Sequence, residues 1–223
     1  MLKFILLQLL FMSQPKPQAQ PILIYVGDPM CSWCYGFAPE LNEVKEHYGD
    51  KLDMELVMGG LRPYNTQMMT ELKDFLTHHW EDVNKASGQE FNYEILSSDR
   101  ITYDTEPPSR AAVVVRKMDP EKEYDFFKKS QTAFYLYNQN MHLAESYDSI
   151  LAELELDTKE FDTLFHSDEM KQLVRKDFER AGEMGVRGFP TLLLKHGDKL
   201  DLISNGYLSS EDIIQRIDKV LVK

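Results

Sequence analysis

The chain contains 223 residues, which is enough for one domain or for one domain that carries an insertion. Its 25 lysines and arginines stand against 37 aspartates and glutamates, and the resulting net charge of −12 argues against a nucleic-acid partner, which would need a basic patch. Only two cysteines are present, so the cysteine count does not identify the compartment in which the protein works.

The first twenty residues combine a signal-like start with a polar leader. Met1–Lys3 and the apolar run Phe4–Met12 resemble the charged start and short apolar core of a secretory signal, and the run is too short to span a bilayer. The following Ser13–Gln20 offers a poor cleavage site, and Met12 could itself be the natural start. We therefore predict residues 1–20 to be a flexible leader of a cytoplasmic protein with no membrane span. Export is the alternative if the apolar run acts as a signal.

A buried strand leads directly into the two cysteines. Ile22–Val26 is continuously apolar, and Cys31 and Cys34 follow it closely. Behind them, apolar residues fall on one face of a helix, namely Phe37, Leu41, Val44 and Tyr48. Because a helix N-terminus presents unpaired N–H groups and positive partial charge, this position favours the thiolate form of Cys31. One turn later Cys34 is close enough to form a disulfide, and we interpret the pair as a redox site.

Two other interpretations of the cysteines stay open. A structural zinc site usually has four Cys or His ligands, and the chain has no second Cys-x-x-Cys and no His-x3–5-His. The neighbours His78 and His79 lie in a helical pattern, where they point to different faces. We predict no metal and no cofactor. Two inert buried cysteines are the second alternative, which the strand-to-helix context disfavours.

The middle of the chain begins with a strand and then becomes helical. Leu52–Met58 suits a second strand, and Gly59–Pro63 ends it. From Thr66 to His166 the pattern is helical. Thr66 is predicted to cap a helix, whose apolar stripe is Met68, Met69, Leu72, Phe75 and Leu76.

Further helices are predicted at residues 111–118, after the cap Asp119–Pro120, at 147–154 and at 159–165. Their methionines and aromatic residues are more typical of a core than of a substrate surface.

The end of the chain returns to an α/β pattern. A helix face runs from Met170 to Ala181 and ends at Gly182 and Gly185. The segment Gly188–Leu194 then enters a strand, which forms an antiparallel hairpin with Leu200–Ser204. Ser209 is predicted to cap a last helix, whose inward residues are Ile213, Ile214, Ile217, Val220 and Leu221.

Two motifs carry a resemblance to a known family. Asp28–Phe37 (DPMCSWCYGF) follows a strand, with Pro39 close behind, and Gly185–Thr191 (GVRGFPT) precedes one. Together they resemble the thioredoxin superfamily, in its DsbA-like branch and within that the FrnE-type, protein-disulfide isomerase-like subgroup. The resemblance implies an α/β thioredoxin-like fold, a central mixed sheet flanked by helices. Residues 21–64 and 167–223 would form the thioredoxin-like domain, and 65–166 a DsbA-like helical insertion.

The resemblance also implies roles for residues. Cys31 matches the exposed nucleophile, and Cys34 matches the resolving cysteine that completes a Cys31–Cys34 disulfide. Pro190 matches the cis-proline opposite the nucleophile, although an ordinary trans proline at a strand start is the alternative.

Three further residues of the two motifs are expected to bind substrate. Phe189 would offer its backbone to an extended substrate peptide. Met30 and Trp33 would form an apolar docking surface, unless Trp33 serves only in packing. Pro39 is expected to kink the first helix.

One departure from the family bears on function. DsbA-like oxidants usually have a histidine between the cysteines, whereas this chain has Ser32 and Trp33. We therefore expect a less oxidising disulfide, in the range of about −180 to −270 mV, which leaves isomerase and reductase roles open.

The expected activity is that of a thiol–disulfide oxidoreductase or isomerase. Its partners would be protein or small-molecule thiols and disulfides, with glutathione among the candidates. Two alternatives are a glutathione-dependent, kappa-class-like isomerase or transferase on the same fold, and a redox-gated chaperone.

Overall fold

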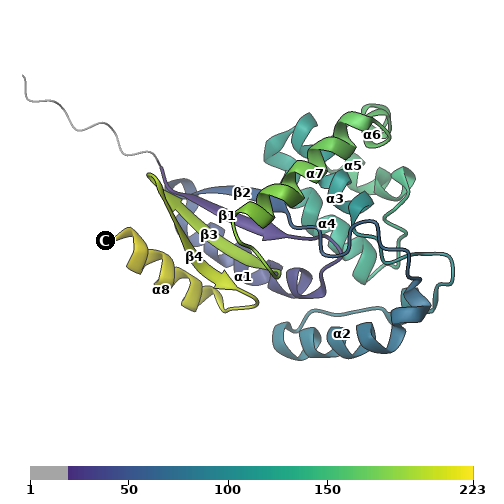
Figure 1. The fold of residues 1–223 in the computed structure, drawn as a ribbon, viewed down its shortest axis with the longest axis horizontal. Coiled ribbons are helices and arrows are strands. Elements are labelled where there is room, and N and C mark those ends of the chain that lie inside the picture. The colour runs from purple at the N-terminus through teal and green to yellow at the C-terminus, as the bar shows by residue number, and fades with distance from the viewer. Residues whose placement is uncertain (1–19, 223) are drawn as a thin grey trace, which may run out of the picture.

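The computed structural model describes residues 20–222, so the signal-like segment and most of the predicted leader lie outside the described residues. Within that range a mixed four-stranded sheet forms, in the order β2-β1-β3-β4 (Figure 1). β1 (Ile22–Gly27) runs parallel to β2 (Asp53–Met58) and antiparallel to β3 (Thr191–His196). β3 pairs with β4 (Lys199–Asn205) through the predicted hairpin, whose turn places Gly197 at φ +58°. The predicted thioredoxin-like fold with a mixed sheet is confirmed.

Each face of the sheet has its own apolar layer, because side chains alternate along a strand. On one face Leu23 and Tyr25 pack among the residues of α1 (Ser32–Tyr48), α4 (Glu123–Tyr135) and α8 (Ser210–Leu221). On the other face Ile24 and Val26 pack with Ala181 of α7 (Asp168–Glu183). The continuously apolar sequence of β1 follows from this burial on both sides.

The stretch between β2 and α7 contributes helices and no strand of the sheet in the described residues. These helices are α2 (Lys73–Ser87), α3 (Glu106–Met118), α4, α5 (Asp148–Glu153) and α6 (Thr158–Phe165). Figure 1 shows α3, α4, α5 and α6 together at one end of the sheet, with α2 apart from them. Most of their aromatic residues belong to the same core as the sheet, which agrees with the prediction that such stripes are packing residues. The division of the chain into residues 21–64 with 167–223 and the insertion 65–166 stays a proposal.

The predicted start of α2 is wrong. Thr66 caps nothing, because a 3-10 turn at Met69–Leu72 precedes the helix, which begins at Lys73. Of the predicted stripe, Phe75 is 49% exposed, whereas Met69 and Leu76 are buried as expected.

The predicted cap of the last helix is confirmed, whereas Asp119 caps the 3-10 turn Pro120–Lys122 and α4 itself begins at Glu123. Asp119 accepts a hydrogen bond from the N–H of Glu121, and Ser209 accepts one from Asp212. Two prolines of α3, Pro107 and Pro108, lie in its first turn, where their missing N–H groups leave no intrahelical bond unmade. At the chain's end Leu221 is 40% exposed, so its predicted inward position is wrong. None of the helices in residues 20–222 is long and apolar enough to cross a membrane.

Candidate active site

The two cysteines lie at the start of α1, directly beyond the end of β1. Cys31 is the N-cap residue, with extended backbone angles, and its carbonyl accepts the first helical hydrogen bond from Tyr35 at 3.0 Å. The turn before it is closed by the Cys31 N–H, which donates to the Asp28 carbonyl at 3.1 Å. The thiol of Cys31 is thus held at a helix N-terminus, as the sequence predicted.

Both thiols are free and buried in the structure, which therefore describes a dithiol form. Cys31 is 5% exposed and Cys34 is fully buried. Burial raises the pKa of the Cys34 thiol, and its hydrogen bond with Cys31 raises that pKa further. The difference in accessibility agrees with an outer and an inner thiol, although Cys31 is less exposed than the resemblance implied. The Cys31–Cys34 disulfide stays a prediction for the oxidised form.

The segment Gly188–Thr191 lies opposite the outer thiol. Cys31 Sγ donates to the carbonyl of Phe189 at 3.8 Å. The Phe189–Pro190 peptide bond is cis, as predicted, and Pro190 is buried. Gly206 fixes the segment from the end of β4, since its N–H donates to the Pro190 carbonyl at 2.7 Å. The two sequence motifs, far apart along the chain, therefore meet at Cys31.

Met30 does not form an exposed docking surface in this structure, which corrects the prediction. Its side chain is 1% exposed and belongs to the core. Its carbonyl accepts a hydrogen bond from the hydroxyl of Tyr103 at 2.5 Å, so Met30 contacts a segment far along the chain. Trp33 is half-buried against Tyr207, with ring centroids 6.0 Å apart. Phe189 is likewise half-buried.

Asp28 is a fully buried carboxylate at the base of the cysteine turn. Its oxygens accept hydrogen bonds from the N–H groups of Met30 at 2.9 Å and Leu61 at 2.7 Å. Burial raises the pKa of Asp28 to about 6, while these two hydrogen bonds act in the opposite direction. The carboxylate ties the cysteine turn to the loop that follows β2.

Three buried tyrosines surround the thiols and were not predicted to belong to the site. They are Tyr25 of β1, Tyr103 before α3, and Tyr135 of α4. Burial raises the pKa of each phenol, and so does the negative charge of a neighbouring cysteine thiolate. For Tyr25 a signal was present, because strand alternation puts it on the face that α1 covers. For Tyr103 and Tyr135 the local sequence gives none.

Pro39 lies inside α1 and exposes a carbonyl that would otherwise be bonded within the helix. That carbonyl belongs to Tyr35, and it accepts a hydrogen bond from Gln89 Nε2 at 3.3 Å. The proline therefore creates an attachment point between α1 and the segment after α2.

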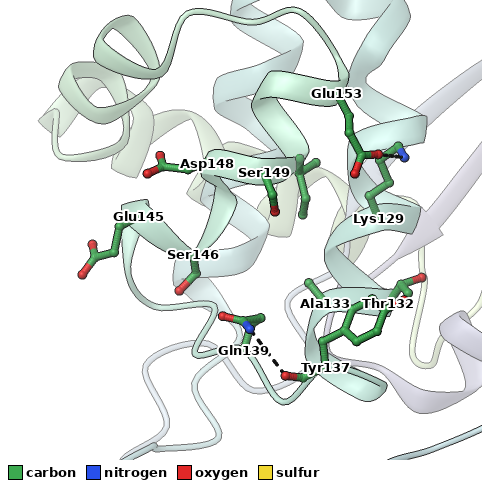
Figure 2. A pocket seen from close by; sticks show the side chains of 11 residues that line it. Lys129, Thr132, Ala133, Tyr137, Gln139, Glu145, Ser146, Asp148, Ser149 and Glu153 are labelled. Atoms are coloured by element: carbon green, nitrogen blue, oxygen red, sulfur yellow. Dashed lines mark hydrogen bonds and ion pairs between the residues drawn. The ribbon is translucent and has the colours of Figure 1, made fainter.

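A separate hollow of about 610 Å³ lies between α4 and α5 (Figure 2). Lys129 and Glu153 form an ion pair at its rim, and Gln139 donates to the Tyr137 carbonyl at 3.5 Å. Figure 2 shows Glu145 and Asp148 pointing outward. The hollow contains neither cysteine, so we do not count it in the candidate site. Residues 20–222 also place no group of three or more His, Cys, Asp or Glu side chains where it could hold a metal ion.

Comparisons with known proteins fit this geometry. A family model described as Thioredoxin matches residues 24–202. The crystal structure of a candidate protein disulfide isomerase from Nitrosomonas europaea is similar, with a TM-score of 0.84 and 35% sequence identity over 91% of this chain and 98% of that one. The cytosolic disulfide reductase DsbM from Pseudomonas aeruginosa shares the fold, with a TM-score of 0.75 and 24% identity over 90% of this chain and 98% of that one.

Among curated proteins, the ClpXP adapter protein SpxH from Halalkalibacterium halodurans is 25% identical over 187 residues, which are 81% of this chain. The matched region is 61% of that relative, so the chain spans about three fifths of the length of the curated relative it matches.

Proposed function

Since this chain belongs to the thioredoxin family and resembles its DsbA-like disulfide oxidoreductases, we propose that it exchanges a Cys31–Cys34 disulfide with substrate thiols. Cys31 is the nucleophile and forms a mixed disulfide with the substrate. Cys34 resolves that mixed disulfide and completes the cycle. The substrates are protein or small-molecule thiols and disulfides.

The observation that supports this proposal most is the placement of Cys31 between a helix N-terminus and the Phe189 carbonyl, 3.8 Å from its sulfur. The helix N-terminus stabilises a thiolate, which is the nucleophilic form. The backbone at Phe189 and Pro190 offers an extended edge beside the sulfur, where a substrate strand can add. Cys34 lies one turn behind, shielded from solvent, so substrate sulfur reaches Cys31 first.

Single-cysteine variants test these roles. We expect Cys34→Ala to accumulate covalent mixed disulfides with substrate, because nothing inside the chain can release them. Cys31→Ala should accumulate none, because the bond never forms. Non-reducing electrophoresis and mass spectrometry of trapped complexes give the measurement.

Ser32→Ala is the matched control, since it lies between the cysteines and leaves both thiols in place. It should trap no more than the wild type. Equal trapping by Cys31→Ala and Cys34→Ala would contradict the assignment of roles.

The alternative on this fold is a glutathione-dependent isomerase or transferase. That chemistry needs no resolving thiol, so the presence of Cys34 favours disulfide exchange. Full catalytic turnover by Cys34→Ala would favour the alternative. The cytoplasmic location, or export if Met1–Met12 acts as a signal, is also a proposal, and cell fractionation tests it.

A further inference from the structure

Arg62 is a half-buried cation in the segment Gly59–Pro63, which follows β2. Its guanidinium donates a hydrogen bond to Gln67 Oε1 at 3.2 Å. It forms no ion pair with any carboxylate of residues 20–222, although acidic residues outnumber basic ones by 37 to 25 in this chain. The charge of Arg62 is therefore open to an anionic group from outside the chain.

The arginine is held in a fixed position by its side chain and by its backbone. The guanidinium carbon lies 5.8 Å from the ring centroid of Phe75 and 5.8 Å from that of Tyr103. The N–H of Arg62 donates to Thr105 Oγ1 at 3.1 Å, and its carbonyl accepts from the Thr105 N–H at 3.2 Å. A side chain that is ordered in advance loses less freedom when it binds a ligand.

Two contacts place this arginine beside the cysteine turn. Leu61, its neighbour in the chain, donates its N–H to the carboxylate of Asp28 at 2.7 Å. Tyr103, whose ring the guanidinium faces, donates its hydroxyl to the Met30 carbonyl at 2.5 Å. Met30 directly precedes Cys31. One backbone residue on one route and one side chain on the other thus separate the arginine from the turn that holds the nucleophile.

The same segment borders the edge where we propose that substrate adds. β1 and β2 are parallel, so their carboxyl ends lie side by side. Gly59 begins the segment there and lies against the ring of Phe189, whose carbonyl faces Cys31. A substrate whose sulfur reaches Cys31 along this edge brings its neighbouring groups toward Arg62.

Two carboxylates of the chain approach the segment, and both are bonded to its backbone. Asp28 accepts from the N–H of Leu61, and Asp104 accepts from the N–H of Tyr64 at 2.7 Å. Each thus holds the segment in place, and neither forms an ion pair with Arg62.

We propose that Arg62 binds a carboxylate of the substrate, so that the site selects thiols and disulfides that carry a carboxylate close to the sulfur. This inference rests on the proposed function and names the substrate class of the same site. A guanidinium presents a planar fork of N–H donors that matches the two oxygens of a carboxylate. The carboxylate can belong to a small molecule or to an acidic residue beside a cysteine in a peptide.

The test compares two disulfide probes that differ in charge. Reduced protein is mixed with 5,5′-dithiobis(2-nitrobenzoate), which carries a carboxylate on each ring, or with the uncharged 4,4′-dithiodipyridine. In both reactions the Cys31 sulfur attacks one sulfur of the probe, the S–S bond of the probe breaks, and an aromatic thiolate leaves with its electron pair. Stopped flow measures the rate of this first release.

We expect Arg62→Gln to slow the reaction with the anionic probe about 10-fold, as for loss of a hydrogen bond to a charged group. Its reaction with the neutral probe should stay within about twofold of the wild type. Arg62→Lys should keep part of the preference for the anionic probe, because it retains the charge without the fork. Arg100→Gln is the matched control, since it makes the same change in net charge at a side chain that is 92% exposed. It should react like the wild type with both probes.

The ionic strength tests the same interaction without a substitution. Raising the salt concentration should reduce the preference of the wild type for the anionic probe and leave that of Arg62→Gln unchanged. A further arm uses two synthetic peptides that carry the disulfide and differ only in a glutamate or a glutamine beside the cysteine. An effect of Arg62→Gln on the small probe alone would assign the site to small-molecule carboxylates, and an effect on the glutamate peptide alone would assign it to acidic peptides.

The outcomes separate this inference from the proposed function. A wild type whose Cys31 reacts with neither probe would overturn the proposed function. If the wild type reacts with both probes and Arg62→Gln changes neither rate, only the inference is overturned. Equal slowing with both probes would also overturn it, because that result indicates that Arg62 only positions the cysteine turn. The same holds if Arg187→Gln, at the exposed arginine before Phe189, removes the preference and Arg62→Gln does not.

Discussion

Asp28 follows directly after an apolar strand, and its carboxylate is fully buried. Its raised pKa of about 6 has a consequence for stability. The folded state binds the proton of Asp28 more tightly than the unfolded state does. The contribution of Asp28 to the free energy of unfolding is therefore fully present below the ordinary pKa near 3.9 and is lost as pH rises through 6. The residue that orders the cysteine turn therefore makes the fold less stable at neutral pH than at pH 5.

We predict that Asp28→Asn removes this pH dependence. Relative to the wild type, the free energy of unfolding of the variant should improve by about 1–2 kcal/mol between pH 5 and pH 7, because asparagine never has to ionise inside the protein. Urea unfolding at the two pH values measures the difference. Asp99→Asn is the control, since Asp99 is on the surface and its variant should track the wild type at both pH values. If the free energies of unfolding of Asp28→Asn and the wild type differed by the same amount at pH 5 and pH 7, the prediction would be contradicted.

Among single residues, the local sequence identified the candidate site but not its surroundings. Cys31, Cys34 and Pro190 stand in short motifs whose chemistry is legible without a structure. Met30 was expected to be exposed, because nothing near it in sequence indicates the Tyr103 hydroxyl that bonds its carbonyl from 73 residues away. Burial depends on such contacts with residues far along the chain, which the neighbouring residues in the sequence do not indicate.

Among the elements, the end of β2 leaves room for a side chain of the loop before β3. Gly59 follows β2 directly, and its N–H donates to the Gly27 carbonyl at 2.7 Å. A Cβ on Gly59 would lie 2.0 Å from the Phe189 ring, which is closer than real contacts allow. The glycine thus sets the position of the residue whose carbonyl faces Cys31.

We predict that Gly59→Ala displaces Phe189 and slows thiol–disulfide exchange at Cys31 about 10-fold, since small displacements near a reacting atom are costly. Overpacking should also reduce the free energy of unfolding by about 1–3 kcal/mol. Exchange kinetics with an aromatic disulfide and urea unfolding measure the two effects. Gly182→Ala in α7 is the control, because nothing lies within 4 Å of its added Cβ. Exchange by Gly59→Ala at the wild-type rate would refute the positioning role.

Element boundaries show where local patterns were sufficient. Ser209 was correctly predicted as a helix cap, and Asp119 caps the 3-10 turn that leads into α4, because a cap acts within its own first turn. Thr66 has the same chemistry but does not cap, because Met68 pairs with Thr102 in an isolated bridge and delays the helix. Pairing with a distant segment overrode a local preference.

At the scale of the whole molecule, one arginine joins the helical segment to the sheet. Arg116 of α3 donates to Glu123 at 2.9 Å and to both oxygens of Asp177 in α7, at 3.0 and 2.8 Å. It also donates to the carbonyl of Leu56 in β2 at 2.9 Å. Burial raises the pKa of Glu123 to about 7, while the neighbouring guanidinium lowers it. Two partly desolvated carboxylates therefore depend on a single cation.

Replacing Arg116 with methionine should destabilise the protein by about 3–5 kcal/mol, because it leaves buried carboxylates without a partner. The free energy of unfolding in urea gives the measurement. Lys117→Met is the matched control on the same helix, since Lys117 pairs with Glu169 at the surface across 3.5 Å and should contribute about 0–1 kcal/mol. If Arg116→Met reduced the free energy of unfolding no more than Lys117→Met does, the network would not be what holds the helical segment to the sheet.

The order of the strands has a consequence for how the chain is made. β1 lies at the centre of the sheet, yet one of its two neighbours, β3, begins only at Thr191. A nascent chain grows at about 5–20 residues per second, so β1 waits on the order of ten seconds or more with one edge unpaired. During that interval Cys31 and Cys34 have been synthesised, but the Phe189–Pro190 segment that faces the outer thiol has not. The redox centre is therefore among the last parts of the molecule to be completed, although its cysteines are among the first residues of the fold to emerge.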